Sequence, residues 1–195
     1  MKIGLFGGSF NPPHLGHRIF AQIFKEQGNL DQLWVMVSPV PPHKNVESLV
    51  DYEHRLSMSK INFEFMDGVI IKQVEEELPP PHFTINTLKY LLKQFPKDTF
   101  YLCIGEDSLR SFETWNSPNE ILNLVDLLVV KRDHLTDTLP KIIQDKKDRV
   151  HWLNADTVPI SSELIRYQLK NGIDSSEYLE PKVLDYITKH KLYGS

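Results

Sequence analysis

The sequence predicts an α/β protein with a doubly wound, Rossmann-like parallel sheet, folded as a single domain over residues 1–195. Three observations lead to this prediction. Short apolar runs recur along the chain, segments with helical periodicity separate them, and 195 residues are enough to bury one full core. Alternation of strand and helix from end to end is typical of right-handed βαβ units, which place helices on both faces of a parallel sheet.

The predicted strands are short apolar runs bounded by turn residues. Runs of this length without polar alternation are typical of parallel strands that are covered on both faces. They are residues 2–6, 32–38, 68–74, 99–105, 126–132 and 149–154.

The predicted helices lie between these runs and at the end of the chain. On the first of them Leu15, Ile19 and Ile23 form an apolar face, joined by Phe20 and Phe24. The helical segments are residues 14–28, 52–66, 83–96, 117–125, 161–172 and 179–194.

Two proline-rich stretches, 38–44 and 77–83, are too short to link domains, so we predict that they are loops at strand ends. Ligands of open α/β sheets bind at the carboxyl ends of the strands. We therefore expect the site residues in such loops.

Composition and charge exclude several classes of protein. The net charge is -4, from 22 Lys and Arg against 26 Asp and Glu, and the two signs are interspersed, so we expect no nucleic-acid partner. No apolar stretch approaches the ~18 residues that would indicate a membrane span, and the first residues do not resemble a signal peptide. The single cysteine, Cys103, lies in an apolar run and is predicted to be a buried hydrophobe. These features favour a cytoplasmic protein without a membrane partner.

The stretch GGSFNPPHLGH, residues 7–17, follows the first predicted strand. Adjacent glycines allow a sharp turn and a close approach of a ligand to the backbone. The stretch contains neither GxGxxG nor the Lys-Ser/Thr of a P-loop. His14 and His17 are three residues apart at a helix start, so they share a face, which we expect to lie opposite Leu15 and its apolar neighbours. Two imidazoles beside helix N–H groups suit phosphate oxygens, so phosphoryl chemistry is the favoured interpretation.

Two other interpretations of this stretch remain open on the residues alone. The glycines and prolines could form an ordinary tight turn, with the histidines on the surface or in the core. His14 and His17 could also chelate zinc, although no carboxylate or cysteine stands nearby in the sequence to complete the ligand set.

The whole string resembles the GG-(S/T)-F-x-P-x-H-x-G-H signature of the nucleotidyltransferase superfamily of adenylyl- and cytidylyltransferases. The resemblance implies the nucleotidyltransferase fold, with glycines that admit a nucleotide and prolines that fix the loop. His14 and His17 would contact a triphosphate and stabilise the charge that develops at its α-phosphate. Such enzymes form no covalent intermediate, so positioning and electrostatic stabilisation supply the catalysis.

A second motif, VPISSELIR, covers residues 158–166. Taken alone, it could be an ordinary helix cap followed by a solvent-facing arginine. It is similar to the superfamily's ISS-(T/S)-x-(I/L)-R motif, which implies that Ser162 and Arg166 bind the phosphates of ATP. Glu163 replaces the usual Thr or Ser and brings a carboxylate near that site.

Four stretches in the middle of the chain resemble segments of the nicotinate mononucleotide adenylyltransferases. Residues 41–44, with His43 and Lys44, resemble PPH-(K/R), although a lone loop lysine is usually solvated. Arg55 lies where that family has R-x-x-M, and by pattern alone it could be a surface charge. Thr84, a candidate helix cap, begins a match to Y-T-(I/V)-D-T-L in which Asn86 replaces Asp.

The fourth stretch, residues 104–115, resembles IG-x-D-x(7)-W, with Glu106 where a small residue is common. There Asp107 would help to hold the nucleotides, and Trp115 would stack on the nicotinate ring, since a planar indole suits an aromatic ligand. A further match, VVKRD, puts Arg132 at a strand end.

Together the resemblances imply an enzyme that transfers the adenylyl group of ATP to nicotinate mononucleotide, giving deamido-NAD and pyrophosphate. The expected partners are these small molecules and Mg²⁺ held mainly by phosphate oxygens and water; a homo-oligomer is left open, and no metal ligands are predicted in the protein. The implied catalytic residues are His14, His17, Lys44 and Arg166. The implied ATP-binding residues are Gly7, Gly8, Ser9, Phe10, His14, His17, Asp107, Ile160, Ser161, Ser162 and Arg166. The implied nicotinate mononucleotide-binding residues are Ser9, Lys44, Thr84, Asp107, Trp115 and Arg132.

Two alternatives remain. Another acceptor, such as nicotinamide mononucleotide or phosphopantetheine, could replace the acid, or the chain could be a sensor that binds nucleotide without turnover.

Overall fold

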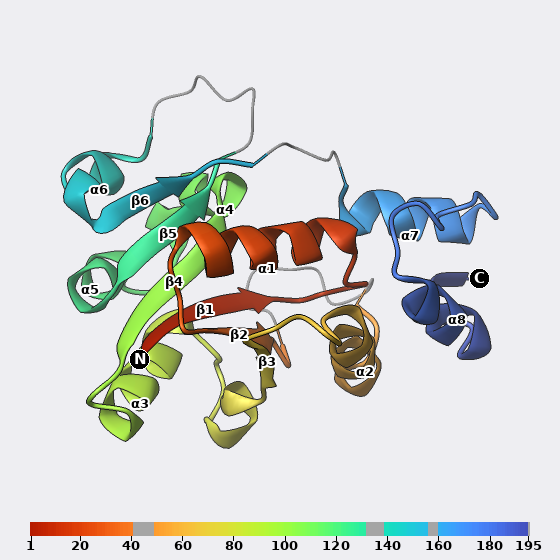
Figure 1. Ribbon diagram of the computed structural model, residues 1–195, viewed down its shortest axis with the longest axis horizontal. Helices are drawn as coiled ribbons and strands as arrows, with labels where there is room; N and C mark the ends of the chain where they lie inside the picture. Colours follow the sequence, from red (N-terminus) through yellow and green to blue (C-terminus); the bar gives the residue numbers. More distant parts are fainter. Residues whose placement is uncertain (41–48, 132–138, 156–159, 195) are drawn as a thin grey trace.

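All the predicted strands are present in a computed structural model, which describes residues 1–40, 49–131, 139–155 and 160–194 (Figure 1). They form one six-stranded sheet in the order β3-β2-β1-β4-β5-β6, and every neighbouring pair is parallel. The predicted doubly wound class is therefore confirmed. The strands are β1 (Lys2–Gly8), β2 (Gln32–Val37), β3 (Val69–Lys72), β4 (Thr99–Gly105), β5 (Asp126–Val130) and β6 (Val150–Leu153).

The predicted helices are also present, with ends that differ by a few residues. They are α1 (Leu15–Gln27), α2 (Tyr52–Asn62), α3 (Thr84–Gln94), α5 (Pro118–Leu124), α7 (Ser162–Lys170) and α8 (Pro181–Lys189). Shorter elements were not predicted as separate helices, because three to five residues are too few for a periodic pattern, although the last of them falls within the predicted helical segment 179–194. These are α4 (Glu106–Arg110), α6 (Lys141–Gln144), η2 (Val74–Glu77), η3 (Phe112–Thr114), η4 (Lys147–Arg149) and η5 (Leu192–Gly194), where η marks a 3₁₀ helix.

Two apolar layers cover the sheet. On one face α1 and α2 contribute Phe24 and Leu56 to a core with Val35 of β2. On the other face α3 and α5 bury Leu88 and Ile121. Helices α7 and α8 form a third cluster with α2, and Figure 1 shows these three helices grouped on the side toward which β1 points.

Helix α1 turns a different face to the sheet than expected. Ala21 and Phe24 are its buried residues, whereas the predicted apolar face is only partly buried. His17 shares this sheet-facing side, because it lies four and seven residues before them, and its ring is 6.2 Å from that of Phe6 on β1. His17 thus lies opposite Leu15, Ile19 and Ile23, as expected, but its side of α1, with Ala21 and Phe24, is the one that packs on the sheet. The aromatic rings of α1, rather than its smaller aliphatic side chains, fill the space above β1.

The strand order reverses between β1 and β4, so the connections that follow these two strands run in opposite directions. A crevice therefore forms at their carboxyl ends, which is where open α/β sheets bind ligands. Cys103 lies on β4 within this sheet and is 1% exposed, which confirms the prediction of a buried side chain. Burial raises the pKa of its thiol. Within the described residues, no helix has the length and apolar character needed to cross a membrane.

Candidate active site

The loop after β1 is anchored in the core by Phe10. This side chain is 1% exposed, and its ring lies edge-on to those of Phe6 and Phe63, with centroid separations of 5.5 and 5.9 Å. The backbone of Phe10 is left-handed, with φ of 45°. Phe10 was expected to bind ATP; because its ring is buried in the core, only its backbone could do so.

The two histidines of the motif lie against each other at the start of α1. Their ring centroids are 3.7 Å apart, and the backbone N–H of His14 donates to Nδ1 of His17 at 3.2 Å. Since Nδ1 accepts that bond, the neutral ring of His17 carries its proton on Nε2. Gly16 leaves room for this arrangement, because a Cβ there would lie 3.0 Å from Nδ1 of His14 and 3.6 Å from Cβ of Ile160.

The start of α7 is hydrogen-bonded to the same loop. Ser161 caps the helix, accepting at Oγ from the backbone N–H of Leu164 at 3.1 Å. Ser162 donates from Oγ to the carbonyl oxygen of Pro12 at 2.9 Å, and Arg166 donates from Nη1 to that of Asn11 at 2.8 Å. The structure thus brings together two motifs that are about 150 residues apart in the sequence.

Asn11 also receives two further bonds at its side chain. Oδ1 accepts from the backbone N–H of Val50 at 3.2 Å and from the hydroxyl of Tyr193 at 2.9 Å. The loop is therefore held from α7, from the segment before α2, and from η5 near the end of the chain.

Arg55 is a further support of the loop, and its burial was not evident from the sequence. It is 1% exposed and donates to the carbonyl oxygens of Ser9, Ser38, Pro39 and Val50 at 2.8 to 2.9 Å. Burial lowers the pKa of its guanidinium. The side chain links the ends of β1 and β2 to α2, so it is not the surface charge that the helical pattern alone allowed.

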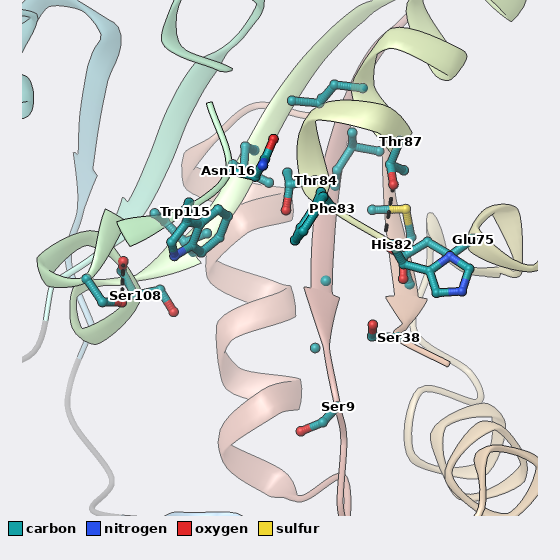
Figure 2. Close-up of a pocket in the computed structure, with 18 of the residues that line it drawn as sticks. Ser9, Ser38, Glu75, His82, Phe83, Thr84, Thr87, Ser108, Trp115 and Asn116 are labelled. Carbon is teal, nitrogen blue, oxygen red and sulfur yellow. Dashed lines mark hydrogen bonds between the residues drawn. The ribbon is translucent and has the colours of Figure 1, made fainter. Parts of the chain in front are cut away.

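A cavity of about 520 Å³ opens beside this loop, large enough for a small-molecule ligand. Its walls come from the ends of β1, β2 and β4, from η2, from the start of α3 and from the segment after α4. Figure 2 shows Trp115 on one side, Glu75 and His82 on the other, and Phe83 with Thr84 between them. The predicted site residues that line it are Gly7, Gly8, Ser9, Thr84 and Trp115.

Thr84 and Trp115, two of the predicted acceptor residues, face this cavity. Helix α3 begins at Thr84, and Phe83 holds the cap position without a side-chain hydrogen bond, so the expectation that Thr84 caps the helix is off by one residue. The ring of Trp115 packs on that of Phe112 at a centroid distance of 5.2 Å and remains partly exposed to the cavity. An indole plane thus faces the same space as an uncapped helix start.

Sequence reasoning missed Glu75, which lines the cavity from η2. Its Oε1 accepts from the hydroxyl of Thr87 at 3.4 Å. Burial raises the pKa of its carboxyl to about 7, against the hydroxyl hydrogen bonds of Ser38 and Thr87, which favour the ionised form. Glu75 is one of three successive glutamates, and nothing in that run indicates which one is buried.

The other predicted residues are placed as follows. Asp107 is exposed in the first turn of α4, and Ile160 is 5% exposed. Lys44 and Arg132, together with His43, lie outside the described residues. In the described part of the chain, no three His, Cys, Asp or Glu residues gather as a metal site.

The two motifs that are predicted to bind phosphate adjoin the cavity, because Gly7, Gly8 and Ser9 line the cavity and lead into the loop that ends at His14. An added Cβ on Gly7 would meet no protein atom within 4 Å. The end of β1 is therefore open to a ligand that extends from the cavity to the two helix starts.

Comparison with known proteins agrees with this geometry. Residues 5–168 match the model of the cytidylyltransferase-like family. The chain is 32% identical over 196 residues to the nicotinate-nucleotide adenylyltransferase of Bacillus subtilis, covering 100% of this chain and 99% of that one. It is 38% identical over 194 residues to a relative from Flavobacterium psychrophilum, with 99% of each chain covered.

The fold is shared with a solved structure of Plasmodium falciparum nicotinic acid mononucleotide adenylyltransferase complexed with NaAD. The TM-score is 0.82 at 22% identity, and the match covers 99% of this chain and 97% of that chain. The chain belongs to the cytidylyltransferase-like family and, within it, to the nicotinate-nucleotide adenylyltransferases.

Proposed function

We propose that the protein transfers the adenylyl group of ATP to nicotinate mononucleotide, releasing pyrophosphate and forming deamido-NAD. This is the adenylyl step of NAD synthesis. The observation that carries the proposal is the joining of two helix starts at one loop, by the bonds Ser162–Pro12 and Arg166–Asn11, beside an aromatic-lined cavity. The relatives' names and full-length similarity support it.

The reaction is an in-line displacement at phosphorus. An oxygen of the acceptor's 5′-phosphate attacks the α-phosphorus of ATP, a new P–O bond forms, and the bond to the pyrophosphate oxygen breaks. A phosphate monoester has a second pKa of ≈ 6, so the attacking oxygen is already ionised near neutral pH. The protein then needs no general base, and its work is positioning and charge stabilisation.

The donors for this stabilisation come from the two helix starts. We infer that His14, His17, Ser162 and Arg166 contact the phosphates of ATP, together with Lys44. The single tautomer of His17 supplies an N–H donor at Nε2, and fixed donors stabilise developing negative charge without reorganising. Arg166 uses one of its five N–H donors on Asn11.

The acceptor's ring would occupy the cavity. Trp115 offers a flat surface for a pyridine ring, and the start of α3 at Thr84 offers backbone N–H groups for its carboxylate. Asp107 and Arg132 complete the proposed acceptor contacts from α4 and from the segment after β5.

We propose that a magnesium ion arrives with the nucleotide and is held mainly by its phosphate oxygens and water. No cage of three or more carboxylate, imidazole or thiolate ligands exists among the described residues, and Mg²⁺ commonly binds through substrate phosphates and water. Mg²⁺ bound in this way would supply charge neutralisation on the leaving pyrophosphate.

The test is an acceptor panel with ATP and Mg²⁺, measuring pyrophosphate release for nicotinate mononucleotide, nicotinamide mononucleotide and phosphopantetheine. We expect the highest kcat/KM with nicotinate mononucleotide. A higher value for either other acceptor would overturn the assignment. Binding of ATP without pyrophosphate release with any acceptor would instead favour a non-catalytic nucleotide sensor.

A further inference from the structure

Glu75 differs from the two glutamates that follow it in η2. Glu76 accepts from the side-chain amide of Gln73 at 2.8 Å, and Glu77 accepts from the hydroxyl of Tyr90 at 2.6 Å; both are exposed. Glu75 instead lines the acceptor cavity, facing the same space as Thr84 (Figure 2). A half-buried carboxyl that lines a ligand cavity calls for a functional explanation.

The groups around Glu75 are polar but provide little positive charge. Thr87 of α3 donates to its Oε1, the hydroxyl of Ser38 lies beside it from the end of β2, and His82 lines the cavity before α3. From α2, Arg55 donates to backbone carbonyl oxygens. The neighbouring Tyr52 hydroxyl lies close to Glu76 and helps to lower the pKa of that carboxyl.

No lysine or arginine is present among the described residues that line the cavity. None of the described lining residues would therefore balance the negative charge of an ionised Glu75. Burial alone already favours its protonated form, since its pKa is about 7.

This charge matters because the two pyridine acceptors differ at one group. Both nicotinate and nicotinamide mononucleotide carry a pyridinium ring and a 5′-phosphate, but only the acid carries a ring carboxylate. The start of α3 can stabilise one negative charge, and a second carboxylate in the same buried space is disfavoured. Ionised Glu75 would thus oppose the acid and leave the amide unaffected.

We propose that Glu75 is a specificity-determining residue, which must hold a proton when the acid acceptor is bound and which sets the acid-over-amide preference according to pH. The neutral carboxyl can also donate its O–H to an acceptor oxygen. This inference rests on the proposed function, because it assumes a pyridine mononucleotide in the cavity.

The test is the ratio of kcat/KM for the acid to kcat/KM for the amide, measured from pH 6 to pH 8. Taking the ratio cancels the titration of the 5′-phosphate, of ATP and of all groups that affect both acceptors equally. For the wild-type protein we expect the ratio to fall about tenfold over this range, following the protonated fraction of Glu75. In Glu75→Gln, which mimics the neutral form, we expect a ratio that stays constant.

Glu76→Gln is the matched control, because it removes the same charge from the next, exposed position. In Glu76→Gln we expect the acid-to-amide ratio of kcat/KM to fall with pH as it does in the wild-type protein. A wild-type ratio that does not change with pH, or an equal fall in Glu75→Gln, would overturn the inference. Absence of turnover with both acceptors would contradict the proposed function instead.

If turnover of the amide acceptor is too slow to quantify, a binding measurement tests the same inference. Calorimetric titration with nicotinate mononucleotide at pH 7.5, in two buffers of different ionisation enthalpy, reports proton uptake. We expect the wild-type protein to take up more protons than Glu75→Gln, by a substantial fraction of one per site. Equal uptake by the two proteins would refute the role of Glu75.

Discussion

His17 shows how single residues prepare this site before a ligand arrives. Its Nδ1 accepts the N–H of His14, its ring lies 4.9 Å from that of Phe10, and the ring of His14 stacks beside it. These contacts fix both the tautomer and the orientation of the imidazole. A donor that is already oriented stabilises a transition state without paying for reorganisation.

Replacing His17 by alanine should therefore act on the chemical step. We expect kcat to fall by ~10²-fold or more, with a smaller change in KM for ATP, because one preorganised donor to the α-phosphate is lost. Steady-state kinetics at saturating acceptor measure both. The control is His151→Ala on β6, a half-exposed histidine paired with Asp126. An unchanged kcat in His17→Ala would rule out the assigned role.

Other residues could not be assigned from the sequence. An arginine on a helix is by default a surface residue, and Arg55 is buried because carbonyl groups from three separate segments converge on it. Phe10 lies within a nucleotide-binding signature, yet its ring is part of the core. In both cases distant segments decide the environment, and a local pattern does not contain that information.

At the scale of elements, the strands were predictable because a parallel strand buried on both faces is a continuous apolar run. The face of α1 that packs on the sheet was not predictable, because periodicity alone did not decide whether the aliphatic or the aromatic residues of the helix are buried there. Docking of η5 onto the first loop was also beyond local reasoning. The motifs indicated that the two helix starts converge, whereas the contact of Tyr193 with Asn11 had no signature in the sequence.

The contact between η5 and the loop yields a second mutational prediction. Tyr193→Phe keeps the aromatic ring but removes the hydrogen bond to Oδ1 of Asn11. We expect a loss of about 1 kcal/mol in the free energy of unfolding, since Asn11 retains the bond from Val50. Because the loop also carries the histidines, kcat should fall several-fold.

Thermal unfolding and steady-state kinetics test these two effects. The matched control is Tyr167→Phe, since Tyr167 is a 62% exposed tyrosine on α7. If Tyr193→Phe matched the wild type in both stability and kcat, the hydrogen bond would have no part in holding the loop.

At the scale of the whole molecule, the cavity makes stability depend on pH. The pKa of Glu75 is about 7 in the folded protein against 4.5 in an unfolded chain, so between these values the unfolded chain releases a proton that the folded protein keeps. Stability should therefore fall as pH rises from about 4.5 to about 7 and change no further from this cause above it.

Chemical denaturation at pH 5 and pH 8 measures this contribution. We expect the free energy of unfolding to drop between the two values by about 2–3 kcal/mol more in the wild-type protein than in Glu75→Gln. Groups shared by the two proteins cancel in this comparison. An identical drop in both would show that Glu75 does not titrate differently on folding.

The distance along the chain between the loop and its supports also affects how the protein is made. Asn11 and Pro12 leave the ribosome 150 to 182 residues before Ser162, Arg166 and Tyr193. At translation rates of about 5–20 residues per second, the loop waits roughly 8–36 s for its partners. We therefore expect the first loop of a nascent chain to lack these supports until the last part of the chain has been synthesised.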